Sequence, residues 1–84
     1  MTRKERVQAA FGKALRKFRL SGGLSQEKLA ELADIHRNYV GDIERGERNI
    51  GIVNMVKVAD ALKVNLSEVV REMEKTVGKK PPTA

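Results

Sequence analysis

The side chains that could do chemistry in this sequence are suited to binding and offer little for catalysis. There is no cysteine and only one histidine, His36, so disulfides and thiolate metal sites are excluded and no metal site is expected. His36 has no nucleophile partner in the pattern, and no acid–base pair stands out. The sequence therefore predicts a protein that is not an enzyme and needs neither a metal nor a cofactor.

Charge points to the kind of partner such a protein would bind. The 84 residues hold 17 Lys and Arg against 11 Asp and Glu, a net charge of +6. The excess lies in residues 1–23, where seven basic side chains face only Glu5, whereas residues 24–84 hold ten of each sign. A basic helix beside a neutral remainder attracts polyanions. A solubilising face is the alternative that charge alone leaves open.

Apolar spacing predicts an all-α fold. Apolar residues recur at three- and four-residue steps, as in amphipathic helices, and no strand signal or repeat interrupts them. Five helices are predicted at about 3–21, 26–33, 36–45, 52–62 and 65–77. Residues 1–77 thus form one domain, and residues 78–84 are expected to be a disordered tail. Residues 1–20 lack the apolar run of a signal peptide, so we expect a cytoplasmic protein without membrane contact.

Residues 26–45 have the pattern of two short helices joined by a tight turn. Ala30 is small where the second helix must cross close to the first, and apolar residues at fixed offsets supply their shared core. These are Leu29, Ala33, Ile35, Val40 and Ile43. The outward face of the second helix is then free to enter a DNA major groove about 12 Å wide. An ordinary helical hairpin is the competing interpretation.

Two segments of the chain resemble the Cro/repressor-like helix-turn-helix family. They are Gly23-Leu24-Ser25-Gln26-Glu27-x-Leu29-Ala30 and Arg37-x-Tyr39-Val40-x-x-Ile43-Glu44-Arg45-Gly46-x-Arg48-Asn49. The resemblance extends over about residues 7–73, and within the family it is closest to the controller proteins of restriction–modification systems. It implies a five-helix DNA-binding domain whose second and third helices form the helix-turn-helix, acting as a transcriptional regulator.

The resemblance assigns base reading to three residues, Arg37, Asn38 and Asp42. Arginine can donate two hydrogen bonds to guanine O6 and N7, and asparagine matches adenine N6 and N7. Asp42 could at best accept from a cytosine amino group, and its carboxylate repels phosphates. For each residue the alternative is a solvated polar side chain on a helix surface.

The same resemblance assigns phosphate contacts, which position a protein on DNA without reading sequence. They fall to Gln26, Tyr39, Arg45, Arg48 and Asn49. Gln26 lies in the first turn of its helix, where free N–H groups favour an anion. Completing the helix cap is its alternative role.

A structural ion pair between Arg19 and Glu44 is a further implication of the resemblance. Neither residue is then a base reader, because their pairing holds the recognition helix at its working angle. Two departures from the family pattern lie in the turn, and a third lies in the later loop, where Ile50-Gly51 replaces the usual proline and capping serine. Asp34 replaces the usual turn glycine, and His36 replaces the usual serine or aspartate cap, so we expect a less rigid recognition helix.

A homodimer on a palindromic DNA operator is the expected assembly. A core this small gains from an interface that hides more apolar surface. The residues expected at the two-fold interface lie on one side of the last helix: Leu66, Val69, Val70 and Met73. Covering the first helix is their alternative role, and no small-molecule substrate is expected. The alternative function is an antitoxin-type module that binds and neutralises a toxin protein.

Overall fold

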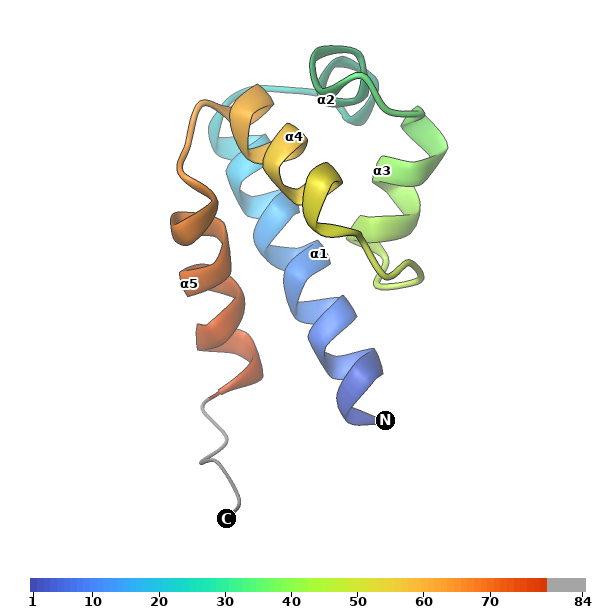
Figure 1. Ribbon diagram of the computed structural model, residues 1–84, viewed down its shortest axis with the longest axis vertical. Coiled ribbons are helices and arrows are strands. Elements are labelled where there is room, and N and C mark those ends of the chain that lie inside the picture. The colour runs from blue at the N-terminus through green and yellow to red at the C-terminus, as the bar shows by residue number, and fades with distance from the viewer. Residues whose placement is uncertain (79–84) are drawn as a thin grey trace.

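The computed structural model describes residues 1–78 and contains five helices there and no strand (Figure 1). Their bounds are α1 Arg3–Ser21, α2 Gln26–Ala33, α3 Arg37–Glu44, α4 Ile52–Leu62 and α5 Leu66–Val77. The all-α prediction is confirmed, with helix bounds within one residue of those expected. Of the predicted tail only Gly78 is described, and residues 79–84 lie outside the described part.

Local capping explains where the helices begin. Thr2 and Glu5 form a capping box at α1, and the hydrogen bonds from Thr2 lower the pKa of the Glu5 carboxyl. Ser25 Oγ accepts from the N–H of Lys28 at 3.0 Å and caps α2. Asn65 and Glu68 form a second capping box at α5. These side chains satisfy N–H groups that the first turn of a helix leaves without partners.

The turn between α2 and α3 forms despite both departures from the family pattern. Asp34 adopts the left-handed conformation with φ 55°, which costs more for aspartate than for glycine. His36 acts as the N-cap of α3, because its Nδ1 accepts a hydrogen bond from the Asn38 N–H at 3.1 Å. The unusual residues therefore keep the usual geometry, with the imidazole in the place of a capping oxygen.

One core holds the five helices together. α1 runs through the middle of the molecule, with α5 along one side and α3 along the other, while α2 lies at the top of the view and packs on α3 and α4 (Figure 1). The buried apolar side chains include Leu15, Leu29, Val40, Ile43 and Val58, each at most 1% exposed. Among residues 1–78 no helix has the length and apolar character needed to cross a membrane.

A close backbone crossing fixes α3 against α1. Gly12 of α1 lies against the carbonyl oxygens of Ile43 and Glu44, so a Cβ there would fall 2.9 Å from the Glu44 oxygen and closer still to that of Ile43. At the next turn, Gly46 has φ 74° and packs against the Cα of Ala9. Two glycines thus allow the end of α3 to rest directly on α1.

Candidate nucleic-acid interface

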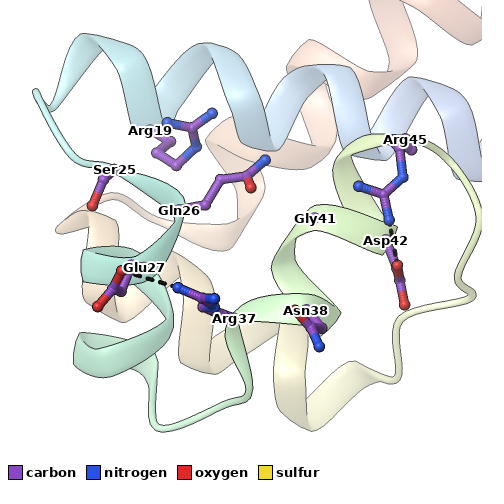
Figure 2. Close-up of a pocket in the computed structure, with 9 residues that line it drawn as sticks. All are labelled: Arg19, Ser25, Gln26, Glu27, Arg37, Asn38, Gly41, Asp42 and Arg45. Carbon is purple, nitrogen blue, oxygen red and sulfur yellow. Dashed lines mark hydrogen bonds and ion pairs between the residues drawn. The ribbon is translucent and has the colours of Figure 1, made fainter.

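The exposed face of the helix-turn-helix is an open groove between α2 and α3. Figure 2 shows its lining, which comes from the start of α2, the outward side of α3 and one residue of α1. The lining residues are Arg19, Ser25, Gln26, Glu27, Arg37, Asn38, Gly41, Asp42 and Arg45. Of the eight residues expected to contact DNA, five line this groove.

Arg37 and Asn38 project from the first turn of α3 into solvent (Figure 2). The Arg37 side chain is 65% exposed, and its Nη1 donates to Glu27 Oε2 at 3.3 Å across the groove. An ion pair this exposed contributes between nothing and about 1 kcal/mol, so a stronger acceptor can replace it. Both side chains are thus free to reach the edge of a base.

Gln26 occupies the first turn of α2 as expected, but its amide also belongs to an internal network. Gln26 Nε2 donates to Glu44 Oε1 at 3.1 Å. The amide oxygen lies 3.5 Å from where a Cβ on Gly41 would be, facing the outer side of α3. Gln26 therefore links the start of α2 to the end of α3, at a place where α2 offers free N–H groups to an anion.

Arg19 and Glu44 form a forked ion pair below the groove. Arg19 Nε donates to Glu44 Oε2 at 2.6 Å and Nη2 donates to Oε1 at 2.8 Å, while Nη1 donates to the Leu24 carbonyl at 2.8 Å. The side chains are only 9% and 4% exposed. The hydrogen bonds to Glu44 raise the pKa of Arg19, against the opposing effect of burial. This pair ties α1, the loop before α2 and α3 together.

The loop after α3 carries two of the expected phosphate-binding residues, Arg48 and Asn49. The Arg48 guanidinium lies over the Tyr39 ring, 5.2 Å from its centroid. The Tyr39 hydroxyl accepts a hydrogen bond from Asn54 Nδ2 of α4 at 3.2 Å. Asn49 is exposed in the same loop. Tyr39 and Arg48 line a second hollow, between α3 and α4, so the structure does not bring all expected DNA contacts into one groove.

The Asp42 carboxylate is engaged by two arginines. Its Oδ1 accepts from Arg45 Nη2 at 2.5 Å and its Oδ2 accepts from Arg48 Nη2 at 3.0 Å. Each oxygen thus has a charged donor in the free protein, and such donors bind a carboxylate more strongly than a neutral amine does. Each oxygen also keeps a lone pair for a further donor, so the base contact at Asp42 stays a prediction.

The last helix also differs from expectation, because much of its apolar side faces inward. Val69 is 0% exposed and belongs to the core, so it has no surface left to bury in a dimer. Leu66 and Met73 are partly buried against that core, and Glu72 pairs with Lys17 of α1 at 2.8 Å. Leu66, Val70 and Met73 keep some accessible surface, so an interface on α5 stays a prediction that depends on these three residues.

Two functional partners escaped the sequence analysis. Glu27, which holds Arg37, and Asn54, which holds Tyr39, each act on a residue of another helix. No periodic pattern connects positions 10 or 15 residues apart across a turn. The only available signal was Asn54 itself, a polar residue within the apolar run Ile52 to Val56.

Comparison with known proteins identifies the family of this chain. A helix-turn-helix family model matches residues 15–69. The chain is 48% identical over 59 residues to the control protein C.BamHI of Bacillus amyloliquefaciens, covering 69% of this chain and 73% of that protein. It is 39% identical over 70 residues to the control protein C.MunI of a Mycoplasma species, covering 82% and 95%.

A solved structure of a control protein has the same fold. The restriction–modification controller protein C.AhdI of Aeromonas hydrophila superposes with a TM-score of 0.73 at 47% identity, covering 74% of this chain and 94% of that one. The fold, the groove between α2 and α3 and these relatives all lead to one assignment. The chain belongs to the helix-turn-helix family of DNA-binding transcription regulators.

Proposed function

We propose that this protein is a controller of restriction–modification genes that binds a palindromic operator as a homodimer in the cytoplasm. The observation that carries the proposal is the exposed start of α3, where Arg37 and Asn38 stand free of the core beside the phosphate-binding start of α2. Similarity to three control proteins, at 48%, 39% and 35% identity, supports the controller role. The proposal assigns the chain no catalytic role.

The proposal divides the site residues into three roles, and the geometry supports this division. Arg37 and Asn38 read base edges, since only they lie at the exposed start of α3 without a strong internal partner. Gln26, Tyr39, Arg45, Arg48 and Asn49 hold phosphates on either side. Arg19 and Glu44 keep α3 at its angle to α1 and α2.

Operator selection tests the proposed function. Purified protein is used to select binding sites from a random DNA library, and the recovered sequence is sought upstream of its own gene and of neighbouring endonuclease and methyltransferase genes. We expect a site with two-fold symmetry whose half-sites lie about 34 Å apart, one helical turn. Recovery of no preferred sequence would count against a regulator. A preferred sequence far from such genes would count against a controller.

A second apolar surface competes with α5 as the dimer interface, since Val69 of α5 belongs to the core. The large apolar side chains left exposed among residues 1–78 include a group at the start of α4: Ile52 at 66%, Val53 at 67% and Val56 at 43%. They follow directly on the loop that carries Arg48. A two-fold interface pairs the same patch on both copies. A pair of these patches would place the symmetry axis next to the loop that carries Arg48.

Two matched variants test whether the dimer forms through the start of α4 or through α5. Val53→Glu should shift the protein toward monomer, because it places like charges opposite each other across the two-fold axis, and should weaken operator binding. Val70→Glu on α5 serves as the comparison and should leave the dimer largely intact. Sedimentation of each variant without DNA gives the result. A dimer that survives Val53→Glu and dissociates with Val70→Glu would return the interface to α5.

The toxin-neutralising alternative makes a different prediction for the purified protein. It requires a second protein that co-purifies with this chain at fixed stoichiometry. A controller needs only DNA and a second copy of itself.

A further inference from the structure

Two acidic residues lie between Arg37 and Gly46, namely Asp42 and Glu44. Glu44 pairs with Arg19, which leaves Asp42 as the acidic residue on the outward side of α3. A carboxylate on this face repels the phosphates of DNA, so its presence calls for a second role that offsets the repulsion. Its side chain is 26% exposed, whereas those of Arg45 and Arg48 are 57% and 52% exposed. The carboxylate is therefore the more enclosed member of a three-residue cluster.

The cluster joins a helix to a loop without regular structure. Arg45 is the C-cap of α3 and Arg48 lies three residues beyond it, before α4 begins. Asp42, one turn back on α3, contacts both guanidinium groups, each through a different oxygen. Glu47 Oε1 accepts from Arg45 Nε at 3.2 Å, and the Tyr39 ring supports Arg48 from the other side. Both arginines are thus held from two directions before DNA is present.

Such an arrangement lowers the cost of binding. A free arginine side chain loses rotamer freedom when a phosphate immobilises it, and this loss reduces affinity by a factor of about two to ten for each side chain. Two arginines already held by Asp42 lose less. Because Asp42 leaves some of the guanidinium N–H groups unused, the arginines can still donate to phosphate oxygens.

We propose that Asp42 is a positioning residue that holds Arg45 and Arg48 ready for the DNA backbone, and that it contacts no base itself. The proposal rests on the proposed DNA-binding function. It predicts a sign opposite to simple electrostatics, since removing a negative charge near DNA ordinarily strengthens binding.

The variant Asp42→Asn keeps the shape of the side chain and removes its charge. We expect it to weaken binding to the selected operator and to random duplex by a similar factor, about three- to tenfold, with the base preference unchanged. Glu31→Gln on α2 is the control, because Glu31 pairs only with Lys28 in the described residues. Unfolding midpoints of both variants check that each is folded.

The direction of the change in DNA affinity can also be tested, by making Asp42→Asn in a protein that already lacks both arginines. When Arg45→Gln and Arg48→Gln are already present, Asp42 has nothing left to position, and only its repulsion of phosphates remains. Asp42→Asn should then strengthen DNA binding. Tighter binding in the otherwise unchanged protein would show that Asp42 only repels DNA. A changed preference at one base pair would show that it reads a base. Either result overturns the proposal.

A measurement without DNA separates this inference from the proposed function. In free ¹⁵N-labelled protein, Asp42→Asn should move the Nε–Hε signals of Arg45 and Arg48 toward those of a freely rotating arginine and leave Arg16 unchanged. Unchanged Arg45 and Arg48 signals would contradict the positioning role. If the protein selects no operator but shows the expected signal changes, the proposed regulatory function is wrong. The role of Asp42 in holding the two arginines is then still supported.

Discussion

Gly12→Ala is expected to lower the free energy of unfolding by about 3 kcal/mol, although alanine is the better helix former by about 1 kcal/mol. The added Cβ would collide with the carbonyl oxygens of Ile43 and Glu44, which are backbone atoms and cannot rotate away. The end of α3 would have to move off α1. A domain of this size has a total stability of about 5 kcal/mol, so the loss is a large part of it.

Gly41→Ala is the matched control, since it is the same substitution inside another helix. The nearest atom to its new Cβ is Arg45 Nη1 at 3.1 Å, at the end of a flexible and exposed side chain. We therefore expect Gly41→Ala to be neutral or to stabilise by up to about 1 kcal/mol. Urea unfolding followed by circular dichroism measures both. Equal effects of the two substitutions would contradict the close crossing of α1 and α3.

Arg19→Ala is expected to cost about 3–5 kcal/mol of stability, because it leaves the Glu44 carboxylate buried without its cation. Gln26 would remain as the only side-chain donor that the structure gives to Glu44, and a neutral amide compensates a charge poorly. The loss of the Leu24 contact would also free the entry to α2. We expect reduced affinity for all DNA, in line with the fraction that is unfolded.

Removing both charges tests this reasoning directly. The double variant Arg19→Met with Glu44→Leu should recover much of the stability lost in Arg19→Ala, since no buried charge remains unpaired. Arg19→Lys should fall between, because an ammonium cannot form the forked contact with both carboxylate oxygens. A stable Arg19→Ala protein with selective loss of operator binding would instead place Arg19 in the DNA interface.

Most of the local structure could be predicted from the sequence, because local interactions determine it. The caps at Thr2, Ser25 and Asn65 set helix starts to within one residue, and each depends on neighbours at most three positions away. The left-handed turn at Asp34 was an implication of the family resemblance, because Asp34 stands where the family usually has the turn glycine. Caps and periodicity are encoded within a single turn of chain.

What could not be predicted depends on how helices meet. The importance of Gly12 arises only when α3 lies on α1, and the partner of Arg37 is on another helix. The apolar side of α5 shows the same limit. Periodicity predicted that Val69 would be buried, but not whether its own domain or a second copy would cover it. In the structure Val69 belongs to the core, and α5 packs along α1. The contacts of Asp42 show the same limit, since nothing in the sequence pattern indicated that two arginines converge on it.

Measuring the base preference of the Arg37→Ala variant tests most directly whether α3 reads the DNA sequence. Affinity of the unchanged protein and of the variant is measured on the selected operator, on operators altered one base pair at a time, and on random duplex. Arg37→Ala should bind the operator more weakly by about 1–3 kcal/mol, lose discrimination at one base pair and bind random DNA almost unchanged. Arg48→Ala, the comparison, should weaken all duplexes alike and reduce the salt slope by about one. If Arg37→Ala instead weakened every duplex equally and kept its discrimination at every position, α3 would not read sequence through Arg37, and the central claim would be wrong.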